Sequence, residues 1–290
     1  MIMVLQLLVN GIALGCIYGL VALGIALIWN AARTLNFAQG DILMLGAYLG
    51  YTALALLRLP YWLGFILVAV LTILFGILFQ RVAYYPLRNR PFILVVVSTI
   101  GISIFLRNAA QISWGNAPVY FPILFRGIVK LGPINLVPQN LFIIIVMVLV
   151  MSALYSLFYR TKLGKMLRAT AQDQEAAHLM GIEVQWMIAL TFALSSLLAG
   201  VAGVLLGPIF FLEPYMGGIV TMRAFIASVV GGFGSIPGAV IGGIIVGLVE
   251  LFSAAYISSM YKDVFVFGLC VLFIVFRPSG LFGESVGEKA

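Results

Sequence analysis

The stretch MVLQLLVNGIALGCIYGLVALGIALIW, residues 3–29, decides the fold class, because it carries no charged side chain over its whole length. A helix needs roughly 20 apolar residues to cross a bilayer, so this stretch is long enough to span one. It is too long for the apolar core of a signal peptide, and no basic region precedes it. We therefore predict a first transmembrane helix here.

The composition extends this prediction to the whole chain. Of the 290 residues, 63% are hydrophobic and only 9% are charged, whereas a soluble domain is typically about 45–50% apolar and about 25% charged. So few charges cannot cover a surface that faces water. The sequence therefore predicts an all-α, polytopic bundle of transmembrane helices embedded in membrane lipid. It excludes a soluble enzyme, a secreted disulfide scaffold and a disordered regulator.

Further apolar runs follow the first one and define the predicted spans. Those near the C-terminus are short, and Arg223 lies inside one of them. We predict eight or nine spans, some of them broken or re-entrant, in a single transmembrane domain over residues 1–290. The further runs lie at about 40–57, 61–83, 92–114, 140–159, 187–212, 217–233, 238–257 and 263–277.

The distribution of Lys and Arg predicts the orientation. If the N-terminus lies outside and all nine segments cross, most basic residues fall in cytoplasmic loops, as the positive-inside rule requires. The C-terminus then lies in the cytoplasm, although one re-entrant segment would reverse it. The net charge of +7 is explained by this bias, so we expect no nucleic-acid partner.

Two loops are long enough to have structure of their own. Residues 115–139 are rich in Gly and Pro and predict an irregular external loop. Residues 160–186, RTKLGKMLRATAQDQEAAHLMGIEVQW, hold seven charges and many helix-favouring residues. Because apolar residues recur there at near-helical spacing, we predict a short amphipathic helix on the cytoplasmic surface. The recurring residues are Leu167, Ala171, Ala177 and Met180.

Small residues recur every four positions, most clearly at Gly11, Gly15 and Gly19. Such faces let helix backbones approach closely in lipid. They predict internal helix packing, with a subunit interface or a moving gate as the alternative.

A Gly- and Pro-rich string interrupts the stretch 228–247. A cluster of four Gly and one Pro within eight residues breaks a helix. A broken backbone at membrane depth is tolerated only where it lies against protein or a water-filled cavity. The string therefore predicts either a discontinuous segment on a transport path or a turn between two short spans. Its residues are Gly231, Gly232, Gly234, Ser235, Pro237 and Gly238.

Several polar residues fall within the apolar runs. An ionised group at mid-membrane costs about 2.5–3.5 kcal/mol on insertion scales, so these side chains are expected to face the bundle interior or to lie near the interface. A charge pair such as Asp41 with an arginine would serve a functional role or a structural one. Functional and structural roles both remain open. The residues are Asn36, Gln39, Asp41, Arg107, Arg223 and Glu250.

Catalytic, metal and cofactor sites are not indicated. The string nearest to a phosphate-binding loop, residues 159–166, lacks both its first Gly and its Ser or Thr. Cys16, Cys270 and the single histidine, His178, predict neither a disulfide nor a metal centre. We expect no enzyme activity, no cofactor and no metal. A channel or a secondary transporter that uses Asp41 or Glu250 is the alternative class.

The loop 160–186 carries a resemblance to a known family. Glu175-Ala176-Ala177, three residues and then Gly181 resemble the coupling motif of ABC importer permeases, although the Leu-Pro that often follows is missing. The resemblance implies that this loop docks on an ATPase subunit. The residues implied in coupling are Arg168, Asp173, Glu175, Ala176, Ala177 and Gly181.

Further strings narrow the resemblance to branched-chain amino-acid ABC permeases of the LivH/LivM family. Asn36-Phe37-Ala38-Gln39-Gly40-Asp41, the loop around Arg168, Gly231–Ala239 and the string 277–283 resemble that family's motifs, in order. The resemblance covers residues 36–283, but urea and short-chain amide permeases look similar.

The resemblance implies a permease subunit of a bacterial inner (plasma) membrane importer for branched-chain or other hydrophobic amino acids. Its implied partners are a second, LivM-like permease, two cytoplasmic ATPases and an extracytoplasmic substrate-binding protein. The candidates for the translocation path or gate are Asn36, Gln39, Asp41, Gly231, Gly232, Gly234, Ser235 and Glu250.

Overall fold

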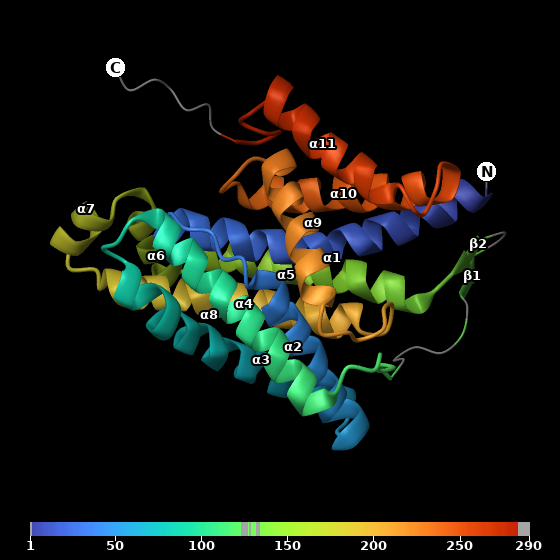
Figure 1. The fold of residues 1–290 in the computed structure, drawn as a ribbon. Helices are drawn as coiled ribbons and strands as arrows, with labels where there is room; N and C mark the ends of the chain where they lie inside the picture. The colour runs from blue at the N-terminus through green and yellow to red at the C-terminus, as the bar shows by residue number, and fades with distance from the viewer. Residues whose placement is uncertain (1, 123–126, 128, 132–133, 284–290) are drawn as a thin grey trace. The chain divides into compact units, whose positions relative to one another are not determined.

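The computed structural model describes residues 2–122, 127, 129–131 and 134–283. Helices form most of it, so the all-helical class predicted from the composition is confirmed (Figure 1). The helices and strands are α1 (Ile2–Ala32), α2 (Gln39–Tyr51), α3 (Tyr61–Phe79), α4 (Phe92–Trp114), β1 (Val129–Leu131), β2 (Ile134–Leu136), α5 (Pro138–Arg160), α6 (Lys162–Gln172), α7 (Gln174–Leu179), α8 (Val184–Leu206), α9 (Met216–Gly231), α10 (Ile236–Tyr256) and α11 (Lys262–Phe276).

Short irregular turns extend two of the helices. A π-helical turn, Thr52–Leu56, continues α2, while a π-helical turn (Gln80–Tyr84) and a 3₁₀ turn (Tyr85–Leu87) continue α3. Proline sets several of the starts, since Pro60 and Pro91 stand immediately before α3 and α4. Within the loop predicted as irregular, β1 and β2 pair in antiparallel register.

Six helices in the described part of the chain are long and apolar enough to cross a membrane. Helix α9 is apolar but shorter, at 16 residues, and α2 and α11 have 13 and 15 residues. All nine apolar runs of the sequence therefore form helices, but only six reach the length of an ordinary span. The six lie at Met3–Ala32, Tyr61–Leu87, Phe92–Trp114, Pro138–Arg160, Val184–Leu206 and Ile236–Tyr256.

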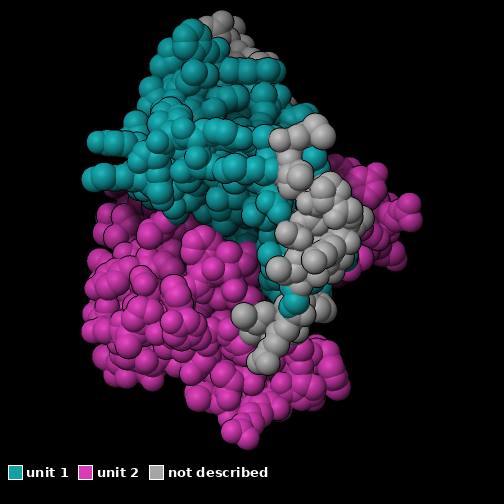
Figure 2. Space-filling view, turned by 90° about the vertical axis from the view of Figure 1, so that its right-hand side faces the viewer, with its two compact units in different colours: residues 1–26, 123–147, 222–290 teal, residues 27–122, 148–221 magenta. Residues whose placement is uncertain are grey.

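The chain divides into two compact units, coloured in Figure 2. Unit 1 comprises residues 1–26, 123–147 and 222–290, and unit 2 comprises residues 27–122 and 148–221. Each unit has its own helix packing, described separately below.

Helix α8 forms the core of unit 2 and packs against both α2 and α3. Glycines allow this packing, because a Cβ on Gly46 of α2 would lie only 2.5 Å from the Gly200 Cα. On its other side, a Cβ on Gly200 would lie 2.5 Å from the Thr72 Cγ2 of α3. The small residues of α2 and α8 therefore serve internal helix packing, as predicted.

In unit 1 the glycine face of α1 packs against α10. A Cβ on Gly15 would lie 2.5 Å from the Ile244 Cα, and a Cβ on Gly243 would lie 2.5 Å from the Gly19 Cα. The two backbones touch, so the four-residue glycine repeat on α1 joins two helices of the same chain.

Candidate functional site

The connection between α1 and α2 carries the Asn-Phe-Ala-Gln-Gly-Asp string, and its polar side chains bond to one another and to α8. The Asn36 Oδ1 accepts the Ala38 backbone N–H at 3.0 Å, while its Nδ2 donates to Gln39 Oε1 at 3.2 Å. Gln39 donates to the Ser195 carbonyl at 3.0 Å and accepts the Ser195 hydroxyl at 3.1 Å. Because all three side chains are buried, this network fixes the connection against α8.

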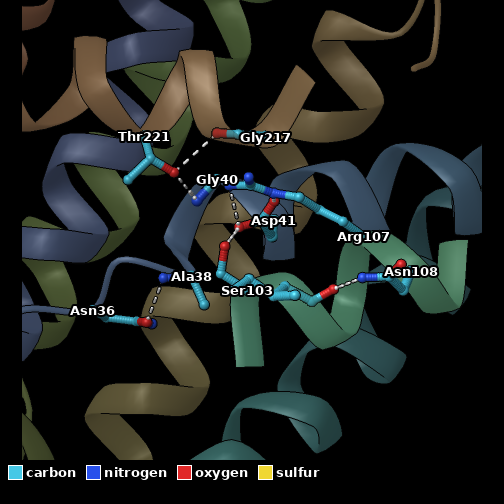
Figure 3. Close-up of polar contacts among 10 residues, drawn as sticks. Asn36, Ala38, Gly40, Asp41, Ser103, Arg107, Asn108, Gly217 and Thr221 are labelled. Carbon is cyan, nitrogen blue, oxygen red and sulfur yellow. Dashed lines mark hydrogen bonds and ion pairs between the residues drawn. The ribbon is translucent and has the colours of Figure 1, made fainter. Parts of the chain in front are cut away.

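Asp41 lies two residues farther on, in the first turn of α2, and forms a buried ion pair (Figure 3). Its Oδ1 accepts Arg107 Nε at 2.8 Å, and its Oδ2 accepts the Ser103 hydroxyl at 2.5 Å and Arg107 Nη2 at 3.3 Å. The Asp41 side chain has no exposed surface. The sequence offered a pair of Asp41 with an arginine as one arrangement, and the structure gives Arg107 as that arginine.

The first turn of α9 lies against the same carboxylate. The Gly40 N–H donates to Thr221 Oγ1 at 2.9 Å, and the Thr221 hydroxyl donates to the Gly217 carbonyl at 2.9 Å. A Cβ on Gly217 would lie 2.6 Å from Asp41 Oδ1. Asp41 thus lies at the N-terminal ends of both α2 and α9, where the helix dipoles stabilise a negative charge.

Sequence reasoning missed two α4 residues that complete this cluster. Thr99, Ser103 and Arg107 follow one another at intervals of four, so they share a face of the helix. The Thr99 hydroxyl accepts the Phe37 backbone N–H at 3.2 Å. The signal that could have revealed them is this four-residue polar spacing inside an otherwise apolar run.

Unit 1 holds a second buried cluster, around Glu250 of α10. Its carboxylate accepts the Tyr18 hydroxyl at 2.8 Å and pairs with Arg223 Nε at 2.8 Å and Lys262 Nζ at 3.1 Å. Arg223 Nη2 also pairs with Asp263 at 2.8 Å. Two positive and two negative side chains therefore neutralise one another where α1, α9, α10 and α11 meet. Glu250 and Arg223 were singled out from the sequence, but their pairing and the other members, Tyr18, Lys262 and Asp263, were not predicted.

The Gly- and Pro-rich string forms a tight turn between α9 and α10. Gly232 and Gly234 have φ values of 107° and 85°, in the left-handed region that glycine adopts without strain. The Ser235 side chain then caps α10 by accepting the Gly238 N–H at 3.1 Å. A Cβ on Gly231 would collide with the Gly238 carbonyl. The predicted break is therefore confirmed, and it takes the form of a turn.

The C-terminal string packs on this turn, a contact that the sequence did not predict. The Leu281 N–H donates to the Val230 carbonyl at 3.0 Å, and the Phe282 N–H donates to the Gly231 carbonyl at 2.9 Å. A Cβ on Gly280 would lie 2.5 Å from the Gly232 Cα. Two glycine-bearing strings that lie far apart in the sequence therefore form one structural unit.

The segment 160–186 contains two short helices, α6 and α7, where the sequence predicted one. Asp173 separates them with an extended backbone, at φ −153° and ψ 114°. Its Oδ1 accepts the Glu175 N–H at 2.9 Å and the Ala176 N–H at 3.0 Å, which caps α7. The single-helix prediction was wrong because an Asp side chain competes with the helical backbone and starts a new helix instead.

Helix α6 is anchored on the end of α5. The Thr161 side chain caps it by accepting the Gly164 N–H at 3.0 Å. A Cβ on Gly164 would lie 2.5 Å from the Phe158 Cα, and Leu167 is buried. The Arg168 guanidinium lies 4.9 Å from the centre of the Tyr159 ring, so this predicted coupling residue packs against the end of α5.

Helix α7 presents most of its side chains to the outside. Of the motif residues, Ala177 is buried, whereas Glu175 and Ala176 are exposed. Leu179 and Met180 are 87% and 83% exposed. Met180 was expected on the same face as Leu167, but the break at Asp173 changes the phase between the two helices.

Gly181 ends this projecting segment. It has a φ of 81°, and a Cβ there would meet no atom within 4 Å. The glycine is therefore required by backbone conformation and not by crowding.

Comparisons with known proteins place this arrangement in a family. Residues 7–275 match the family described as "Branched-chain amino acid transport system / permease component". The high-affinity branched-chain amino acid transport system permease protein LivH of Escherichia coli (strain K12) is 38% identical, over 98% of this chain and 97% of the relative. The corresponding permease protein BraD of Pseudomonas aeruginosa is 37% identical over the same shares.

The fold also resembles that of a solved structure. PsaBC from Streptococcus pneumoniae, in complex with Fab, matches with a TM-score of 0.51 and 13% identity, over 93% of this chain and 91% of that one. At this identity the match shows a common fold.

Proposed function

The chain belongs to the branched-chain amino acid transport permease family, and on this premise we propose that it forms the translocation pathway of an ABC importer for branched-chain or other hydrophobic amino acids. Its relatives in Escherichia coli and Pseudomonas aeruginosa are named as permeases of that substrate class. The proposed assembly contains a second, LivM-like permease, two cytoplasmic ATPases and an extracytoplasmic substrate-binding protein, in a bacterial inner membrane.

The projecting segment Glu175–Gly181 carries the proposal. Glu175, Ala176 and Leu179 are exposed together on a six-residue helix, and the exposed Met180 and the left-handed Gly181 follow it. Because exposed Leu and Met side chains gain free energy when a partner covers them, α7 has the chemistry of a knob that seats in a protein groove. We propose that this groove lies on an ATPase subunit.

The proposed mechanism begins with closure of the ATPase dimer when ATP binds. The movement enters the permease through α7 and re-packs helices that meet through glycine. Asn36, Gln39 and Asp41 are each at most 3% exposed, so in this conformation they are closed to solvent. We propose that they act as a gate whose hydrogen bonds to α4 and α8 exchange during transport.

We propose a topology of eight or nine crossings. Six come from the long helices, and the others come from α2, α9 and α11. A helix of 16 residues is about 24 Å long, which is shorter than the roughly 30 Å hydrocarbon core. The short helices therefore need their flanking turns to complete a crossing. Labelling of single introduced cysteines with an impermeant thiol reagent in intact cells would count the crossings and locate both termini.

Two substitutions test the docking role of α7. Glu175→Lys reverses the charge of the exposed motif carboxylate, and Gly181→Leu forces a branched side chain into the left-handed region. Both should reduce co-purification of the ATPase subunits and ATP-driven uptake into proteoliposomes. Glu183→Lys is the control, because it makes an equal charge reversal within residues 160–186 but outside α7. If both α7 variants transport normally and keep their ATPases, the coupling role is wrong.

The substrate class has its own test. The assembled importer is purified with its binding protein, and the ligand that the binding protein retains is identified by mass spectrometry. We expect leucine, isoleucine, valine or another hydrophobic amino acid. Retained urea, a short-chain amide or a sugar would contradict the amino-acid assignment. Uptake by the permease alone, without ATPases, would favour a channel or secondary transporter.

A further inference from the structure

The first residue of α7 is tied to the last turn of α1. The Gln174 Nε2 donates to the Ala31 carbonyl oxygen at 2.7 Å, across 143 positions of sequence. Both residues belong to unit 2, and the bond is partly buried. Gln174 immediately precedes Glu175 but is not one of the residues that the family motif singles out.

The bond supplies a partner that the end of α1 lacks. The last four carbonyls of a helix have no intrahelical N–H donor. Arg33 ends α1 in the left-handed conformation, with a φ of 49°, and its N–H returns to the Trp29 carbonyl at 2.9 Å. The Ala31 carbonyl instead receives its hydrogen bond from α7. The end of α1 is therefore held by the segment proposed to meet the ATPase.

The same end of α1 leads directly to the buried polar cluster. Residues 33–38 connect it to α2, and this connection holds Asn36 in its network with Gln39 and Ser195. Only residues 32–35 separate Ala31 from Asn36, so a displacement of the end of α1 reaches Asn36 along the chain itself.

The two helices of the segment are anchored differently. Helix α6 is fixed to α5 through Gly164, where no side chain fits. Helix α7 follows an extended residue, Asp173, and its one buried side chain is Ala177. A displacement of α7 therefore has a route to α1 through Gln174 that does not require α6 to move.

We propose that Gln174 is a positioning residue that transmits displacement of α7 to the end of α1 and so to the connection 33–38. The proposal rests on the proposed function, because the displacement is ascribed to the ATPase subunits. Beyond the proposed function, it states that the hydrogen bond from Gln174 to Ala31 is needed to couple ATP hydrolysis to transport and is not needed for docking of the ATPase subunits.

The assembled importer in proteoliposomes, with its binding protein, tests this role. Gln174→Glu keeps the shape of the side chain but removes the N–H donor and places a negative charge against the carbonyl. Gln174→Lys restores a donor on a side chain of sufficient length. Gln185→Glu makes the same amide-to-carboxylate change at an exposed position of the segment and serves as the matched control.

The measured quantity is substrate transported per ATP hydrolysed, alongside co-purification of the ATPases. Since the net worth of one hydrogen bond changes an equilibrium by about fivefold, Gln174→Glu should lower the ratio by about that factor with unchanged co-purification. Gln174→Lys should restore most of it, and Gln185→Glu should leave it unaltered.

Three results would overturn the proposal: an unchanged ratio in Gln174→Glu, no recovery in Gln174→Lys, or loss of the ATPases from Gln174→Glu, which would assign the residue to docking. The docking role itself is judged separately in the same assay by Glu175→Lys. If that variant keeps its ATPases and its transport, the proposed function fails whatever Gln174 does.

Discussion

The Asp41 carboxylate is completely buried, whereas the Arg107 side chain that it binds at 2.8 Å keeps 27% of its surface exposed. The two side chains of this ion pair therefore differ in whether they can reach water when the partner is removed. Arg107 can turn toward its exposed side, but Asp41 cannot reach water.

This asymmetry predicts that Arg107→Gln destabilises the permease more than Asp41→Asn. An unpaired buried charge costs about 3–5 kcal/mol, while the neutral amide in Asp41→Asn still accepts the Ser103 hydroxyl and should cost about 1–3 kcal/mol. Thermal unfolding of the detergent-solubilised protein measures the difference. The double variant Asp41→Asn with Arg107→Gln should be more stable than Arg107→Gln alone. Equal losses in the two single variants would contradict the asymmetry.

The Glu250 cluster predicts a second ranking. Glu250 is 3% exposed, accepts hydrogen bonds from Tyr18 and Lys262 and forms an ion pair with Arg223, whereas Lys262 is 30% exposed. Glu250→Gln removes the negative charge that faces Arg223 and should cost about 3 kcal/mol. Lys262→Gln leaves Glu250 paired with Arg223 and should cost less than about 1 kcal/mol. The same thermal assay compares them, and a greater loss in Lys262→Gln would show that Arg223 does not dominate the cluster.

Helix packing in unit 2 predicts opposite outcomes for two glycines. Gly46→Ala places a Cβ 2.5 Å from the Gly200 Cα, and overpacking of this kind costs about 1–3 kcal/mol. Gly101→Ala, in α4, meets no atom within 4 Å and exchanges glycine for a better helix former, so it should be neutral or stabilising by up to about 1 kcal/mol. If both variants unfold at the same temperature, the close contact of α2 and α8 is wrong.

The cap of α7 predicts a local effect. Asp173→Ala removes the acceptor for the Glu175 and Ala176 N–H groups, at a cost of about 1 kcal/mol. Amide hydrogen exchange at those two positions should accelerate about fivefold, and ATP-driven transport should fall. Asp173→Asn, an equally good cap, should preserve both. Unchanged exchange in Asp173→Ala would mean that α7 does not depend on its cap.

Structural features that depend on a single stretch of sequence could be predicted from the sequence. The apolar runs became helices, the four-residue glycine repeats became helix contacts, and the string around Gly232 became a break. The division of segment 160–186 was missed, because the helical spacing of its apolar residues outweighed the capping chemistry of Asp173. The pairing of Glu250 with Arg223 was missed, as were its partners Tyr18 and Lys262, because these residues come from three other helices, α9, α1 and α11.

The sequence by itself determined that this chain lies in a membrane and where its helices run, because the cost of burying charge in lipid acts on each segment separately. It also determined the family, through strings whose order is read directly along the chain. Only the tertiary structure decided that Asp41 pairs with Arg107, that Gln174 reaches Ala31, and that residues 280–283 pack on the turn at Gly232. These contacts join residues far apart in sequence, and their hydrogen bonds depend on distances of about 3 Å that no periodicity specifies.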